Sequence, residues 1–166
     1  MRGKLSDIVR AITPRLDTRA AAGAGVISVV AYTAVMEFDR WLTGSRVDDL
    51  ILLGRPLVPG RPELARPVGA ALHLANGVVI GTAYAALAHD RLPGPPWVRG
   101  VTALMIENLL LYPLAIPERK VHPAIRDGQL DDYWTWPAFA ESLPPHLIYG
   151  ALIGPLYERF RTGRTG

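Results

Sequence analysis

The chain has 166 residues, of which 49% are hydrophobic and 20% are charged, and its formal net charge is +3. This length suits a single domain of ordinary composition. The sequence contains no cysteine, which excludes a disulfide framework, thiolate chemistry and a cysteine-ligated metal. The excess positive charge flanks apolar stretches rather than forming a basic patch, so we expect no nucleic acid partner.

The charged residues are gathered in short segments that separate four long apolar stretches. We predict that these stretches are transmembrane helices at about residues 20–42, 67–88, 97–117 and 134–157. Each is close to the roughly 20 residues that a helix needs to cross a hydrocarbon core about 30 Å thick. A helix of a soluble bundle would carry polar residues at every third or fourth position, and neither "AAAGAGVISVVAYTAVM" nor residues 67–88 does so. The sequence therefore predicts an all-α integral membrane protein in a lipid bilayer.

The segments between the predicted spans differ in character. Residues 1–19 are basic and lead into the first span without a cleavage site, so we predict an uncleaved cytoplasmic or interfacial segment. Residues 43–66 and 118–133 are predicted as outer loops of a single membrane domain, 1–166. The stretch "DLILLG" in the first loop is too short to span and is predicted as a surface or re-entrant turn of helix, and the second loop as an ordered cap.

The distribution of Lys and Arg predicts the orientation. The side that carries both termini has ten of these residues and the opposite side has eight. Because basic residues concentrate on the cytoplasmic side, this bias favours both termini inside the cell.

A motif occurs twice, as "HLANGVVIGTAY" from His73 and "HLIYGALIGPLY" from His146. Its His, Gly, Gly and Tyr positions fall on one stripe of a helix, at about 100° per residue. Glycines four residues apart let two transmembrane helices approach closely, so we predict helix packing at Gly77, Gly81, Gly150 and Gly154.

The spans before the two motifs also match, because Glu37 and Glu107 each follow a short apolar run that includes a methionine. The chain is therefore predicted as two repeated hairpins that form a pseudo-two-fold four-helix bundle.

Ionisable residues inside the predicted spans form the candidate functional site. A charge in a membrane is costly, so such residues suggest a function by default. We expect a polar cluster of Glu37, His73, Asn76, Glu107, Asn108, Glu141 and His146 between the helices.

Three functions of this cluster stay open. It could be a proton or ion path, because His titrates near neutrality and a desolvated Glu can approach the same range. Pro144 and Pro145 favour this reading, since they are predicted to break the fourth span just before His146. It could be a structural clamp in which each His hydrogen-bonds a Glu.

The third function is a metal or haem site, with His73, His146, Glu37 and Glu107 as candidate ligands. The Glu-x-x-His spacing of di-iron bundles is absent, and no cofactor is assumed. The signatures of phosphate-binding loops, serine hydrolases and zinc peptidases are also missing, so an enzyme is not favoured. His89 is predicted as part of an interfacial helix end and His122 as an ordinary loop residue.

The two motifs resemble the His-glycine-tyrosine spans of small bacterial inner-membrane proteins of the YagU-like type. This resemblance covers the second and fourth spans and implies a bacterial plasma membrane location. Our leading hypothesis is a small ion- or proton-handling membrane protein. The alternatives are a non-catalytic subunit of a membrane assembly and a metal- or haem-binding membrane enzyme; a homodimer or a partner in a membrane complex is possible in each case.

Overall fold

The computed structural model describes residues 16–163, which are almost entirely helical and contain no strand. The long helices are α2 (Thr18–Thr43), α4 (Ala65–Leu87), α5 (Pro96–Leu111) and α8 (Trp136–Thr162). The connections contain α3 (Asp49–Gly54), η1 (Arg55–Leu57), η2 (Pro62–Leu64), η3 (Tyr112–Leu114), α6 (Ala115–Val121) and α7 (Pro123–Arg126). Most of the predicted interfacial segment lies outside the described residues, and α2 already begins at Thr18.

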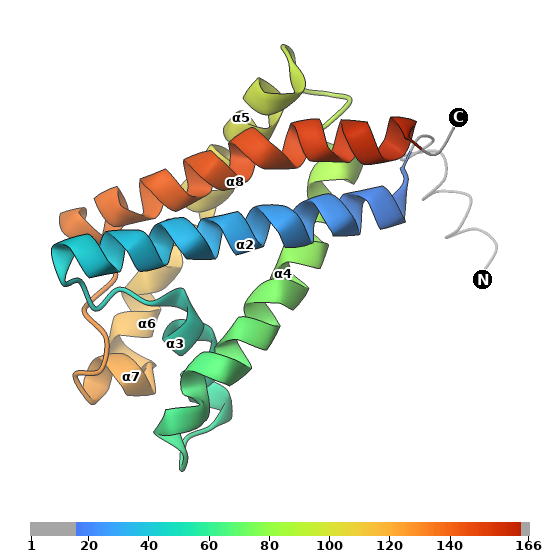
Figure 1. Ribbon diagram of the computed structural model, residues 1–166. Helices are drawn as coiled ribbons and strands as arrows, with labels where there is room; N and C mark the ends of the chain where they lie inside the picture. The colour runs from blue at the N-terminus through green and yellow to red at the C-terminus, as the bar shows by residue number, and fades with distance from the viewer. Residues whose placement is uncertain (1–15, 164–166) are drawn as a thin grey trace, which may run out of the picture.

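The two longest helices, α2 and α8, lie side by side and run in opposite directions (Figure 1). Helix α4 packs on α2 and α5 packs on α8, so the helices follow the order α4, α2, α8, α5. The beginning of α2 and the end of α8 lie at the same end of the molecule. Helices α4 and α5 form no extensive interface with each other.

Three helical segments are long and apolar enough to cross a membrane: Thr18–Thr43, Pro62–Leu87 and Pro96–Val121. The chain therefore has the helices of a membrane protein. The fourth predicted span lies within α8, which does not reach the required hydropathy. This helix carries Glu141, His146, Glu158 and Arg159 besides three prolines, and these residues lower its mean hydropathy.

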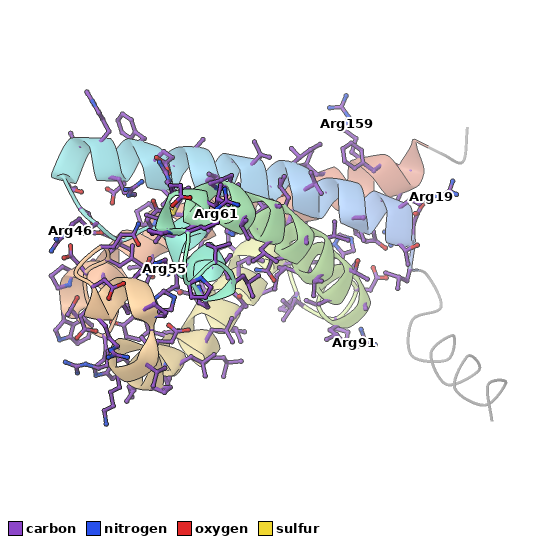
Figure 2. All side chains as sticks on the ribbon, turned by 90° about the horizontal axis from the view of Figure 1, so that it is seen from below. Arg19, Arg46, Arg55, Arg61, Arg91 and Arg159 are labelled. Carbon is purple, nitrogen blue, oxygen red and sulfur yellow. The ribbon has the colours of Figure 1, made fainter. Side chains whose placement is uncertain are left out.

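Arginines lie toward both ends of the long helices. In Figure 2, Arg46 and Arg55 lie toward the end that carries the short helices, and Arg19, Arg91 and Arg159 lie toward the other end. The length of α2 agrees with this division, because its 26 residues extend about 39 Å at about 1.5 Å per residue.

Glycines permit the contact between α2 and α4. A Cβ atom on Gly25 would lie 2.0 Å from the carbonyl oxygen of Gly77, and one on Gly81 would lie 2.4 Å from the carbonyl oxygen of Ala21. A Cβ on Gly77 would meet the side chain of Val29 at 2.6 Å. The backbones of the two helices are therefore in direct contact, as small residues allow between membrane helices.

The contact between α5 and α8 has the same pattern. A Cβ atom on Gly100 would lie 2.0 Å from the carbonyl oxygen of Gly150, and one on Gly154 would lie 2.0 Å from the carbonyl oxygen of Pro96. In both helix pairs, two positions four residues apart on one helix meet two glycines four residues apart on the other.

Helix α8 is continuous from Trp136 to Thr162, with Pro144, Pro145 and Pro155 inside it. The predicted break before His146 is therefore wrong. Each proline removes one backbone donor from the helix. Because α8 is packed between α2 and α5 along its length, these interfaces hold the helix together despite the lost bonds.

Two loops lie at the end of the molecule that is opposite the start of α2 and the end of α8. They pack on each other and form what we call the cap. Ile51, Ala65, Ala124 and Leu130 form a small buried core there. Arg55 pairs with Asp127 at 2.9 Å and Arg46 with Asp131 at 2.6 Å, so ion pairs also join the two loops. His122 belongs to this cap, because its Nε2 lies 2.8 Å from the carbonyl oxygen of Leu52.

A second polar group lies at the other end. His89 is fully buried and contacts the rings of Tyr84 and Tyr157, at 5.5 and 4.8 Å between ring centroids. The Tyr84 hydroxyl and His89 Nδ1 are 3.0 Å apart. His89 lies just beyond the end of α4, as predicted, and is part of the packing between α4, the α4–α5 loop and α8.

Candidate functional site

A cavity of about 260 Å³ lies between the long helices and the cap. Helices α2, α4, α5 and α8 supply its walls, and α3, α6 and the loop before α8 line the end toward the cap. Its ionisable lining residues are Tyr32, Asp49, His73, Glu107, Tyr112, Glu118, Tyr133, Glu141, His146 and Tyr149. Among residues 16–163, no lysine or arginine lines the cavity.

Tyr32 is the central residue of the cavity. It is 6% exposed, and its hydroxyl donates a hydrogen bond of 2.6 Å to Asp49 at the start of α3. Its ring contacts the rings of both motif histidines, with centroids 5.2 Å from His73 and 5.0 Å from His146. Tyr32 therefore links the two histidines to a carboxylate of the cap.

His146 and Glu107 form the one carboxylate–histidine contact of the cavity among the described residues. The Nε2 atom of His146 lies 3.4 Å from Oε2 of Glu107. The other ring nitrogen, Nδ1, donates to the carbonyl oxygen of Ser142 at 2.7 Å. This bond assigns a hydrogen to Nδ1, so Nε2 is the atom that gains or loses a proton beside the carboxylate.

His73 has a different environment. It is 7% exposed, and neither ring nitrogen has a hydrogen-bond partner. Buried polar groups are normally paired, so an unpaired pair of nitrogens facing a cavity requires an explanation such as water or a ligand. The repeated motif thus produces one histidine with a carboxylate partner and one without.

The two amides of the predicted cluster and Glu141 make different contacts in the cavity. Asn108 is buried and donates through Nδ2 to the hydroxyl oxygen of Ser142 at 3.0 Å. Asn76 lines the cavity one turn after His73. Glu141 lines it as well and accepts a hydrogen bond from the Ser45 hydroxyl. Six of the seven predicted cluster residues therefore line this cavity.

Glu37 does not line the cavity and belongs to an ion-pair network at the end of α2. It pairs with Arg40 on its own helix and with Arg66 at the start of α4. The same two arginines pair with the fully buried Asp48, at 3.0 and 3.1 Å. Asp48 also caps the N-terminus of α3, so this network joins three helices.

The candidate ligands for a metal or a haem are not arranged as such a site would require. Within residues 16–163, no three His, Asp or Glu side chains come close enough together to hold a metal ion. Glu37 lies outside the cavity, and the ring of Tyr32 contacts both histidines. A macrocycle between His73 and His146 would have to displace that ring.

Several residues of the cavity were missed by the reasoning from sequence. Tyr32, Tyr149 and Ser142 carry no formal charge, and Asp49 was assigned to a loop rather than to the membrane domain. Tyr149 had a signal that could have found it, since it follows His146 by three residues and so lies on the same helical face. The Tyr149 hydroxyl donates to the carbonyl oxygen of Gly77 at 3.4 Å.

A family model described as "Family of unknown function (DUF6789)" matches residues 16–165. The chain belongs to DUF6789. The match includes all four long helices and the cap, so the cavity is part of the DUF6789 region. No curated protein and no solved structure matches the chain. Membership of DUF6789 assigns no activity, and the resemblance to YagU-like proteins stays a prediction.

Proposed function

We propose that this DUF6789 protein is a four-span membrane protein that binds and exchanges protons at Glu107, His146 and His73. The observation that carries the proposal is the environment of His73, whose buried ring nitrogens face the cavity without a partner. A structural clamp explains the contact of His146 with Glu107 and leaves His73 unexplained, because a clamp histidine would bind a carboxylate.

The antiparallel pairing of α2 and α8 supports a fourth span. Helix α8 has 27 residues and lies along α2, which has 26 and is apolar enough to cross a membrane. A helix of this length beside a spanning helix is long enough to cross the same hydrocarbon layer. Glu141 and His146 of α8 line the cavity, as charged groups in spans generally face the interior, and Arg159 is exposed near the end of the helix.

The equal glycine spacing at the two helix contacts supports a duplicated hairpin. The pair α2 and α4 would correspond to the pair α5 and α8. We place the chain in a bacterial plasma membrane with both termini cytoplasmic, in keeping with the ten basic residues on that side. The cap would then lie on the outer side.

The chemistry follows from the two ring nitrogens of His146. Nδ1 donates to Ser142 in either protonation state of the ring. Nε2 therefore either carries a proton, so that the charged ring pairs with the Glu107 carboxylate, or carries none, so that the ring is neutral. A proton can therefore reside on either group. The cavity is large enough for several water molecules, which could carry the proton to the free nitrogens of His73.

Proton flux into reconstituted vesicles tests this function. Vesicles loaded with a pH-sensitive dye receive a pH step, with potassium and valinomycin present to cancel the membrane potential. We expect the wild type to equilibrate pH faster than empty vesicles, and Glu107→Gln to slow the flux at least about a hundredfold, the lower end of the range that positioned proton donors typically contribute. Glu63→Gln, at an exposed carboxylate of the first loop, is the matched control and should keep the wild-type flux.

A different result of this experiment would contradict the proposed proton exchange. If wild-type vesicles equilibrate no faster than empty ones while Glu107→Gln melts well below the wild type, the cluster is a clamp and the proposal fails. A His73→Phe variant separates the two cases further, since it removes both free nitrogens and keeps an aromatic ring against Tyr32. Proton handling predicts lost flux with an unchanged melting temperature for this variant.

A further inference from the structure

A groove of about 360 Å³ lies between α4 and α5, where these two helices diverge. Its α4 side runs from Ile80 to Leu87, about 10 Å at about 1.5 Å per residue. Its α5 side runs from Ala103 to Leu111. Both helices lie within segments that can cross a membrane, so the groove faces the hydrocarbon region.

The lining of the groove is apolar except at two residues. Tyr84 is one of them, and its hydroxyl is already bonded to His89. The other is Glu107, whose side chain is 26% exposed. The groove thus presents a single carboxyl group within a surface of alanine, leucine and isoleucine side chains.

The groove leads into the polar cavity. Ile80, Glu107 and Leu111 line both spaces, and Glu107 is the only ionisable residue that they share. A molecule in the groove could therefore hold its apolar part between α4 and α5 while its polar end reaches the cavity.

The charges of the residues that line the cavity indicate the charge of the ligand that it would bind. The cavity has four carboxyl residues, Asp49, Glu107, Glu118 and Glu141, and no lysine or arginine. This arrangement disfavours the phosphate of a phospholipid and the carboxylate of a fatty acid. It favours a positive nitrogen, which the rings of Tyr32, Tyr112, Tyr133 and Tyr149 can also attract through their faces.

We propose that the groove and cavity together bind a lipophilic organic cation, with its apolar chain between α4 and α5 and its positive nitrogen beside Glu107. This inference rests on the proposed function, because the cation and the proton compete for the same carboxylate. Binding of one cation would then release a proton, and the protein would couple the two.

Several ionisable groups besides Glu107 face the shared region and contribute to its pH dependence. They are His146, Glu141 and Tyr149 on α8, His73 and Tyr84 on α4, Tyr32 on α2, Asp49 on α3, Tyr112 on η3, Glu118 on α6 and Tyr133 before α8. Lower pH neutralises Glu107 or adds a positive charge to His146, and both changes oppose the cation. We therefore expect the affinity to fall as the pH falls.

Calorimetric titration of the protein in lipid nanodiscs tests the proposal, with empty nanodiscs as the blank. The probes are decyltrimethylammonium and decyl sulfonate, which share one alkyl chain and carry opposite charges. We expect saturable binding of decyltrimethylammonium and none of decyl sulfonate. Glu107→Gln should weaken the binding at least about tenfold, equivalent to about 1.4 kcal/mol.

A second pair of variants tests the groove. Ala103→Phe fills it and should weaken binding, whereas Leu109→Phe adds the same ring on an exposed face of α5 that does not line the groove. Equal binding of the two probes, or unchanged binding in both Glu107→Gln and Ala103→Phe, would mean that the groove only accommodates a lipid chain, and would overturn the proposal.

Infrared spectroscopy separates this inference from the proposed function. The band of the protonated Glu107 carboxyl, identified by its loss in Glu107→Gln, should change with pH if the site exchanges protons. A titrating band without decyltrimethylammonium binding would overturn the cation proposal alone. Cation binding without any titration of Glu107 would overturn the proton function and the competition derived from it.

Discussion

Replacing Gly25 with alanine should force α2 and α4 apart. The new Cβ atom would lie 2.0 Å from the carbonyl oxygen of Gly77, whereas ordinary contact begins at 3.4 Å, so the helices would have to separate by about 1.4 Å. A gap of about 0.5–1 Å already removes a quarter to a half of the dispersion energy of each contact.

The net change in the free energy of unfolding is the difference between the cost of overpacking and the gain in helix propensity. Overpacking of this kind costs about 1–3 kcal/mol. Alanine is better than glycine in a helix by about 0.5–1 kcal/mol, which offsets part of that cost. We expect a net loss of about 1–2 kcal/mol, which lowers the melting temperature of a chain of this size by about 2–8 °C.

Gly23→Ala is the matched control on the same helix. There the new Cβ would meet only the ring of Phe160, at 3.6 Å, an ordinary contact. This variant should melt at or above the wild-type temperature. Both variants can be followed by tryptophan fluorescence during heating in detergent. If Gly25→Ala melts as high as Gly23→Ala, the two backbones are not in contact and the argument is refuted.

Two further predictions concern the ends of the molecule. Asp48→Asn removes a buried charge from two arginines and should cost about 2–3 kcal/mol, below the full cost of a buried pair because Arg40 keeps Glu37 and Arg66 is half exposed. Asp131→Asn breaks an exposed pair with Arg46 and should change stability by less than about 1 kcal/mol; equal losses in chemical unfolding would contradict the assigned burial. Burial, with Arg161 nearby, lowers the pKa of His89 below its ordinary value of about 6.5, so the unfolded chain binds a proton that the folded protein does not. Stability should therefore decline as the pH falls below about 6.5, and His89→Gln should flatten that decline in melting curves; an unchanged slope would show that other groups cause it.

The glycine positions illustrate what could be derived from the sequence. A stripe of glycines in an apolar segment has few physical uses, and close helix packing is the commonest, so spacing alone predicts helix contacts at Gly77 and Gly150. The depth of a residue along its span could be derived in the same way. His73, Glu107 and His146 do line one cavity.

The sequence alone does not predict how each helix is rotated about its own axis, nor which side chain each residue contacts. Glu37 and Glu107 follow similar apolar runs, yet Glu37 meets Arg66 while Glu107 meets His146. The difference depends on residues of other helices. The same holds for Tyr32, whose partner Asp49 comes from a short helix of the loop. The low hydropathy of α8 also has a tertiary context, because two of its polar residues, Glu141 and His146, line the cavity between the helices.

The position of α8 between α2 and α5 has a consequence for biosynthesis. Of the four long helices, α8 joins the two halves of the molecule and follows the other three in the chain, so it is synthesised after them. Until residues beyond Thr135 have been made, the α2–α4 hairpin and α5 share no extensive interface. Helix α8, which is not among the three helices apolar enough to cross a membrane, therefore packs against α2 and α5 after both have been made. The cavity, which needs His146 and Tyr149, exists only after this final step.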